Sequence, residues 1–210
     1  MKYIIMCGGH YKEWQTPKHM VEIKGEPIVA RTIRLLRECG VKDIAISTHD
    51  DRFKRFGVPL LKHENDYYAK AYNDMTGYWC NAFYPMDEPV CYIFGDVVFS
   101  PQAIKTIVDY EVEDIMLFGS KPPFAPEYPK KWIEPFAYKV KDTSRLKNAC
   151  DEVKALDKLG VYKRKPIAWE LWSAICGSPP NYIDKSYVAI NDYTCDIDNK
   201  EDIEAFERVL

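Results

Sequence analysis

Short apolar runs and helically spaced apolar residues alternate along this chain. Continuous apolar runs predict buried strands, and the sequence has them at residues 2–6, 44–47, 58–61, 90–94, 115–118 and 136–140. A further short strand is expected at residues 20–23, before a turn at 24–27. Strands that alternate with helical segments predict an α/β fold built on a parallel sheet.

Helices are predicted where apolar residues recur at helical spacing, over residues 28–39, 73–84, 101–110, 167–176 and 198–210. Ser100 is expected to cap the helix that begins at Pro101, and Gly40 to end the first helix. The proline-rich stretch 121–135 favours irregular structure, and residues 141–163 are expected to form polar turns.

Composition narrows the classes of function. The chain has 210 residues and a net charge of -3, which argues against a general nucleic-acid binder. Seven cysteines without a C-x-x-C pair argue against a zinc site or a thioredoxin motif, and predict reduced thiols in a cytoplasmic protein. No apolar stretch is long enough to predict a membrane span.

A glycine pair follows the first predicted strand. Without side chains, Gly8 and Gly9 let backbone N–H groups approach phosphate oxygens closely. Lys18, which follows Pro17, could fold back over the same phosphates and neutralise their charge. The alternative is a tight turn next to a surface lysine. Neither the dinucleotide fingerprint nor the P-loop pattern is present.

Acidic residues follow two later segments. Asp96, after Gly95, comes at the end of the strongest predicted strand, where ligands bind in open α/β sheets. Its carboxylate could hold Mg²⁺, which prefers oxygen ligands, or it could begin a turn. Asp196 and Asp198 would point the same way in an extended segment, and either could be a second ligand. The alternative is that Asp198 or Asn199 caps the last helix.

The order of these motifs resembles the GT-A-like nucleotidyltransferase family, and especially small cytidylyltransferases such as the phosphocholine cytidylyltransferases of bacterial surface-polymer pathways. Gly8-Gly9, Pro17-Lys18, Gly95-Asp96 and Asp196-Ile197-Asp198 carry the resemblance, which spans nearly the whole chain. Further similar segments are residues 25–32, 35–36, 41–44, 71–74, 169–170 and 196–202.

The resemblance implies a three-layer α/β/α fold with a mostly parallel mixed sheet. It implies one domain, 1–210, with a nucleotide-binding half to about residue 120, an acceptor-side portion at about 121–195 and a closing helix at 198–210. The activity implied is Mg²⁺-dependent transfer from an NTP, with CTP favoured, to a phosphorylated small-molecule acceptor, for surface-polysaccharide or headgroup activation. Pyrophosphate would be released, and a homodimer is compatible with this reading.

The resemblance also implies roles for individual residues. The catalytic residues would be Lys18, Asp96 and Asp198, with Asp96, Asp198 and Asp196 as metal ligands. The nucleotide would lie against Met6, Cys7, Gly8, Gly9, Lys18, Asn73, Asp74, Thr76 and Gly95. Acceptor binding is expected from Trp132, Trp169, Glu170 and Tyr193, where aromatic rings could cage a quaternary ammonium group. The alternative is that these aromatic residues, with Trp172, pack the core.

One loop differs from the family pattern. Related chains usually carry G-x-G-[ST]-R after the first strand, where this chain has residues 10–14 without a second glycine or an arginine. Three other functions stay open: a sugar-1-phosphate or molybdopterin nucleotidyltransferase, a GT-A glycosyltransferase, and a nucleotide-binding module without catalysis. Gly95-Asp96-Val97 lacks the second aspartate of the usual glycosyltransferase D-x-D motif.

Overall fold

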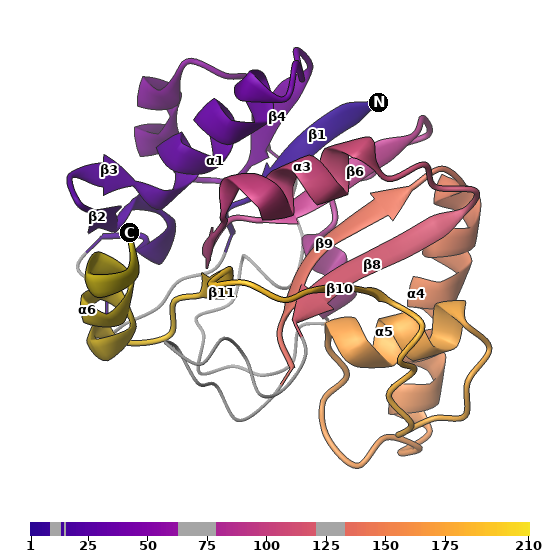
Figure 1. Cartoon of the computed structure of the whole chain (residues 1–210). Coiled ribbons are helices and arrows are strands. Elements are labelled where there is room, and N and C mark those ends of the chain that lie inside the picture. Colours follow the sequence, from indigo (N-terminus) through magenta and orange to yellow (C-terminus); the bar gives the residue numbers. More distant parts are fainter. Residues whose placement is uncertain (9–13, 15, 63–78, 121–132) are drawn as a thin grey trace.

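A seven-stranded sheet runs through the molecule, with helices packed around it (Figure 1). The structure is a computed structural model that describes residues 1–8, 14, 16–62, 79–120 and 133–210. The strand order is β10-β8-β9-β6-β1-β4-β5. Among these strands β9 runs antiparallel to both of its neighbours, while the other described pairs are parallel. The predicted mostly parallel mixed sheet is therefore confirmed.

The described strands of this sheet are β1 Lys2–Met6, β4 Ile44–Ser47, β5 Leu60–Leu61, β6 Val90–Phe94, β8 Ile115–Ser120, β9 Pro135–Val140 and β10 Val188–Ile190. Two small ribbons pair β2 Glu22–Ile23 with β3 Glu26–Pro27, and β7 Val97–Val98 with β11 Cys195–Asp196. The helices are α1 Ile28–Glu38, α3 Pro101–Asp109, α4 Thr143–Lys158, α5 Ala168–Ile175 and α6 Lys200–Val209. Short 3₁₀ helices span Lys18–Met20, Asp51–Phe56 and Trp79–Ala82.

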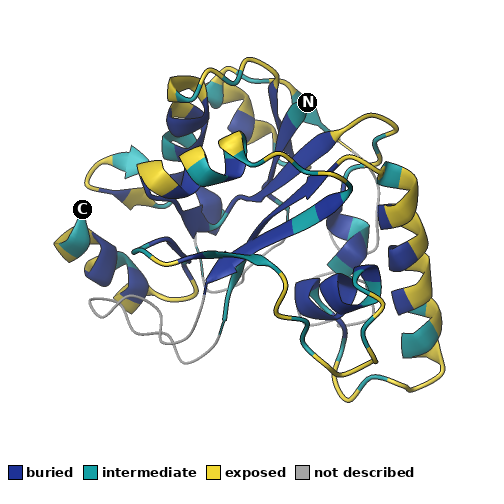
Figure 2. Ribbon diagram, turned by 45° about the vertical axis from the view of Figure 1, so that its right-hand side comes forward, coloured by how far each residue is buried: buried dark blue, intermediate teal, exposed yellow. Residues whose placement is uncertain are grey.

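Different helices cover the two faces of the sheet. Because successive strand residues point to opposite faces, neighbouring residues of one strand contact different helices. Tyr92 of β6 lies opposite Tyr138 of β9, and the Tyr138 ring contacts Trp172 of α5. On the other face, the Lys139 ammonium donates to carbonyls at the end of α3. Since α1 packs with α3 and α4 with α5, the chain has three layers. Figure 2 shows buried strands between helices whose outer surfaces are exposed.

Capping residues explain where two of the helices begin. The Ser100 side chain accepts a hydrogen bond from the Ala103 N–H at 2.9 Å, and Pro101 opens α3 as predicted. The Asn199 side chain accepts one from the Asp202 N–H at 3.0 Å and begins α6. The expected cap before the last helix is therefore Asn199. Among the described residues, no helix is long and apolar enough to cross a membrane.

One prediction of secondary structure was wrong, and another falls only partly within the residues that the structure describes. Residues 143–158 form helix α4, where polar turns were expected. Its buried stripe is narrow, consisting of Leu146, Ala149, Cys150 and Val153, and the charged residues around it hide the helical period. Of the helix predicted over 73–84, residues 79–82 form a 3₁₀ helix, and residues 73–78 lie outside the described part.

Candidate functional site

The sequence-predicted acidic residues gather at one edge of the sheet. β6 leads into Gly95-Asp96 at this edge, and the antiparallel β9 begins there, directly after Glu134. The β7–β11 pair brings the C-terminal segment alongside, where the Ile197 N–H donates to the Asp96 carbonyl at 3.0 Å. Ligands bind beyond this carboxyl edge in open α/β sheets. Residues 96 and 198 are thus brought together although they are far apart in the sequence.

Lys18 lies at the centre of this group. It opens the 3₁₀ helix after Pro17 and is only 2% exposed, so the alternative of a surface lysine is wrong. Its ammonium nitrogen is 2.7 Å from Asp96 Oδ2 and 3.6 Å from Asp198 Oδ1. It also donates a hydrogen bond to the Ile197 carbonyl at 2.9 Å. Two of the predicted catalytic residues, Asp96 and Asp198, therefore contact the buried ammonium of the third, Lys18.

Burial shapes the charges of this group. Burial alone would raise the pKa of Asp96, but the Lys18 ammonium, with smaller effects from His19 and a backbone hydrogen bond, brings the pKa below its ordinary value. His19, next along the chain, has a pKa lowered to about 4 by burial and by the Lys18 charge, against the opposing effect of Asp96. At neutral pH an uncharged His19 imidazole therefore lies beside the ion pair of Lys18 and Asp96.

Gly95 allows the ends of β1 and β6 to approach each other. A Cβ atom at this position would lie 2.5 Å from the Met6 carbonyl oxygen and 2.6 Å from Cys7 Sγ. The Gly95 N–H donates to that same carbonyl at 3.0 Å. A larger residue would force the two strand ends apart and displace Asp96, which follows directly.

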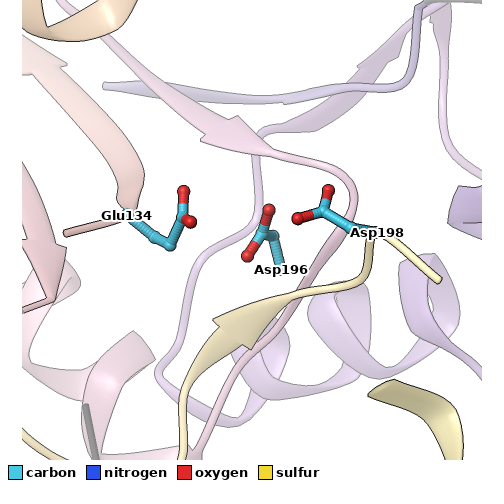
Figure 3. A group of neighbouring side chains, drawn as sticks. All are labelled: Glu134, Asp196 and Asp198. Atoms are coloured by element: carbon cyan, nitrogen blue, oxygen red, sulfur yellow. The ribbon is translucent and has the colours of Figure 1, made fainter. Parts of the chain in front are cut away.

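Three carboxylates converge beside Lys18. Oxygen atoms of Glu134, Asp196 and Asp198 all lie within 4.8 Å of one another, and Figure 3 shows the three side chains turned toward a common space. Glu134 is held in place by Ser120, whose hydroxyl accepts from the Glu134 N–H and whose own N–H donates to the Glu134 carbonyl, both at 2.8 Å. Such hard oxygen donors fit Mg²⁺.

A comparison with known protein families assigns the chain to one of them. Residues 3–164 match the model of the MobA-like NTP transferase domain. The chain belongs to this family. No curated protein sequence matches the chain. The family of this NTP transferase agrees with the predicted nucleotidyltransferase class, whereas the finer resemblance to cytidylyltransferases stays a prediction.

Several solved structures are similar to this NTP transferase over nearly its whole length. One is 4-diphosphocytidyl-2C-methyl-D-erythritol synthase from Anaerococcus prevotii, with 12% identity, a TM-score of 0.59 and coverage of 99% of this chain and 96% of that one. Another is the inositol-1-phosphate CTP transferase from T. maritima, with 15% identity, a TM-score of 0.53 and coverage of 99% and 95%. A putative glucose-1-phosphate thymidylyltransferase from Bacillus anthracis has 18% identity, a TM-score of 0.52 and coverage of 99% and 94%. These likenesses confirm the fold.

The predicted nucleotide-binding residues of the NTP transferase are partly described. Met6 and Cys7 are buried where β1 ends, and Gly8 follows them. Burial raises the pKa of the Cys7 thiol, with a smaller effect from Asp96, so this thiol is not activated as a nucleophile. The other predicted contacts, Gly9, Asn73, Asp74 and Thr76, lie outside the described residues.

The predicted acceptor residues are engaged in other contacts. Trp169 is buried against Tyr187, and Glu170 accepts hydrogen bonds from Arg164 Nε at 2.8 Å and from the Ile167 N–H at 2.9 Å. The Tyr193 hydroxyl accepts from Arg31 at 3.1 Å. Trp132 lies outside the described residues. Trp169 and Trp172 are both buried in the core. A role of Trp132, Trp169, Glu170 and Tyr193 in acceptor binding stays a prediction.

Glu134 is the site residue that sequence reasoning missed. The signal available was a carboxylate two residues before the strand predicted at 136–140. A residue before a parallel strand would lie at the opposite edge of the sheet, far from Asp96. Only because β9 is antiparallel does Glu134 reach the edge where Lys18 lies.

Proposed function

We propose that this NTP transferase catalyses Mg²⁺-dependent transfer of a nucleotidyl group, with CTP the favoured donor, to a phosphorylated small-molecule acceptor. The observation that carries the proposal is the buried contact of Lys18 with Asp96 and Asp198 at the carboxyl edge of the sheet. In this arrangement the buried ammonium provides a positive charge for phosphate oxygens, and the carboxylates around it provide ligands for a metal ion.

Lys18 is the residue expected to stabilise the charge that develops at the α-phosphate. The acceptor's phosphate oxygen is already an anion at neutral pH, so in-line attack on phosphorus needs no general base. Catalysis then depends on positioning and on charges that are in place before the reaction. Asp96 and the Ile197 carbonyl fix the Lys18 ammonium, which limits the reorganisation required in the transition state.

Asp96 and Asp198 are the proposed metal ligands, with Asp196 or Glu134 on the adjoining side. These carboxylates would hold Mg²⁺, whose positive charge would offset the negative charge of the phosphates and of the leaving pyrophosphate. The Asp198 side chain is 54% exposed and lies 3.6 Å from Lys18, so it can turn toward a metal ion at low cost. Asp96 is held more tightly at 2.7 Å.

CTP is favoured because of the resemblance to small cytidylyltransferases. Two of the similar solved structures carry names that contain a cytidyl group or CTP, which is consistent with this choice. The third is named a thymidylyltransferase, so the fold accommodates other bases. An acceptor for surface-polysaccharide or headgroup activation follows from the same resemblance.

Pyrophosphate release tests this proposal. CTP, UTP, GTP, ATP and dTTP would each be incubated with Mg²⁺ and with phosphocholine, sugar 1-phosphates or glycerol phosphate. We expect release with one preferred pair, CTP being the preferred NTP. Asp96→Asn should abolish it, whereas Asp87→Asn, the same change at an exposed position, should retain it.

Other outcomes distinguish the alternative functions. Full activity in Asp96→Asn would remove Asp96 from the site and contradict the proposal. Nucleotide binding without pyrophosphate release from any pair would favour a non-catalytic module. Sugar transfer from a sugar nucleotide, without pyrophosphate release, would indicate a glycosyltransferase.

A further inference from the structure

A pocket lies at the edge of the sheet opposite Lys18. Val90 at the start of β6 pairs with Val140 at the end of β9, so these ends meet away from the edge that carries Asp96 and Glu134. The pocket, of about 860 Å³, opens there. Its walls come from the 3₁₀ helix Trp79–Ala82, the loop after it and the first three turns of α4.

Two cysteines from distant parts of the chain line this pocket. Cys80 comes from the 3₁₀ helix and Cys150 from α4, and each is 7% exposed. The Cys80 thiol lies 3.9 Å from the Cys150 carbonyl oxygen, so the two cysteines are in contact. The other five cysteines of the chain do not line the pocket. The structure therefore brings together one thiol pair beside a space that a small molecule can enter.

The two thiols are chemically unequal. The pKa of Cys80 is lowered, chiefly by its interaction with the Cys150 side chain and, against the effect of burial, by the Lys154 ammonium, which also lines the pocket. The same contact, together with burial, raises the pKa of Cys150. By contrast, burial raises the pKa of Cys91 to about 12. Cys80 is thus suited to act as the thiolate that is oxidised first, and Cys150 as the thiol that then forms a disulfide with it.

We propose that Cys80 and Cys150 form an oxidation site that accepts a small hydroperoxide from this pocket and closes to a disulfide. The Cys80 thiolate attacks the terminal peroxide oxygen, the O–O bond breaks, and Cys80 becomes a sulfenic acid as the peroxide leaves as water or alcohol after protonation. The Cys150 sulfur then attacks the sulfenic sulfur, forming the S–S bond and releasing water. Each peroxide accepts two electrons, and two thiols are oxidised.

Hydrogen peroxide treatment of the full-length protein tests this site. After alkylation of the remaining thiols, digestion without reductant should yield one linked peptide pair containing Cys80 and Cys150. Titration of the denatured protein should show two fewer free thiols. Because the disulfide closes a loop between residues 70 apart, oxidation should raise Tm by about 5–10 °C.

Serine variants separate the two roles. Cys150→Ser should stop at a sulfenic acid on Cys80 that dimedone traps, and Cys80→Ser should leave Cys150 unreacted. Cys39→Ser, at a half-buried cysteine outside the pocket, should form the disulfide as the wild type does. The untreated Tm of each variant checks that it folds.

The wild-type peptide map also provides the contradicting results. Oxidation of Cys39 or Cys176 before Cys80 would overturn the proposal. So would conversion of Cys80 to a sulfinic acid without linkage to Cys150. Neither result bears on nucleotidyl transfer, because the pocket and the Lys18 site lie at opposite edges of the sheet.

Discussion

Two buried lysines in this NTP transferase have different surroundings. Lys18 is 2% exposed and contacts two carboxylates and one carbonyl. Lys139 is 5% exposed, and its ammonium donates to the carbonyls of Ile107, Val108 and Tyr110 at 2.9, 2.8 and 2.7 Å. The second arrangement lies at the C-terminal end of α3.

The difference separates a structural cation from the one that we propose acts in catalysis. The last carbonyls of a helix lack partners within the helix and carry the negative end of its dipole, so an ammonium there satisfies them permanently. Burial lowers the pKa of Lys139, against the smaller opposing effects of Cys91 and Asp109. Lys18 instead contacts two carboxylates that we propose as metal ligands, at the edge of the sheet where we propose that a phosphate binds.

The largest effect is expected from removing the proposed catalytic cation. Lys18→Met should lower kcat for pyrophosphate release by about 10²–10³-fold, because it deletes a preorganised charge at the reacting phosphate. KM should change far less, since the interaction strengthens in the transition state. Steady-state kinetics with the preferred substrate pair would measure both. An effect on KM alone would reduce Lys18 to a binding residue and weaken the contrast with Lys139.

His19 provides a second test, because it is buried beside Lys18 and must stay neutral. Its pKa of about 4 in the folded state lies below the ordinary value of 6.5. Between these values the unfolded chain binds a proton that the folded chain does not, so stability falls as pH falls from 6.5 to 4. The loss reaches about 3 kcal/mol at full shift.

Urea unfolding at several pH values measures this dependence. His19→Gln should remove the His19 contribution. The stability of this variant relative to the wild type should therefore rise as the pH is lowered from 6.5 to 4. His49→Gln, at an exposed histidine, should follow the wild-type curve. If His19→Gln and the wild type lose stability in parallel, His19 is not held neutral by its surroundings.

The structural cation is expected to give the smallest of these effects. Lys139→Met keeps the length of the side chain but leaves carbonyls at the end of α3 without their donor. The free energy of unfolding should fall by about 2 kcal/mol, which corresponds to a Tm lower by roughly 4–8 °C. Activity at 25 °C should stay close to that of the wild type. A kcat loss comparable to that of Lys18→Met, with an unchanged Tm, would reverse the two assignments.

Much of the fold follows from local sequence patterns. Strands such as β1 and β6 are continuous apolar runs, and α3 and α6 have both a periodic apolar face and a capping residue. Helix α4 was not predicted because its buried stripe is narrow and its other positions are mainly polar or charged. The short strands β10 and β11 depend on partners far away in the sequence, β8 and β7, which local periodicity does not reveal.

The predictable part of the site is the part carried by short motifs. Lys18, Asp96 and Asp198 were expected from the family resemblance that the order of their motifs carries, and the structure brings Lys18 into contact with both carboxylates. Glu134 was not expected, because its position depends on the direction of β9 in the sheet. The aromatic residues proposed for acceptor binding have no spacing that distinguishes a binding surface from core packing, and Trp169 is buried.

Binding of Mn²⁺, followed by the loss of the EPR signal of the free ion, tests the central claim most directly. Mn²⁺ takes the same oxygen ligands as Mg²⁺, and this measurement does not require the acceptor to be known. We expect Asp96→Asn and Asp198→Asn to weaken Mn²⁺ binding at least about 10-fold. The exposed variant Asp87→Asn should bind as the wild type does, and thermal melting would confirm that all three are folded. Equal Mn²⁺ affinity in all three variants and the wild type would contradict a metal-dependent transfer site around Lys18.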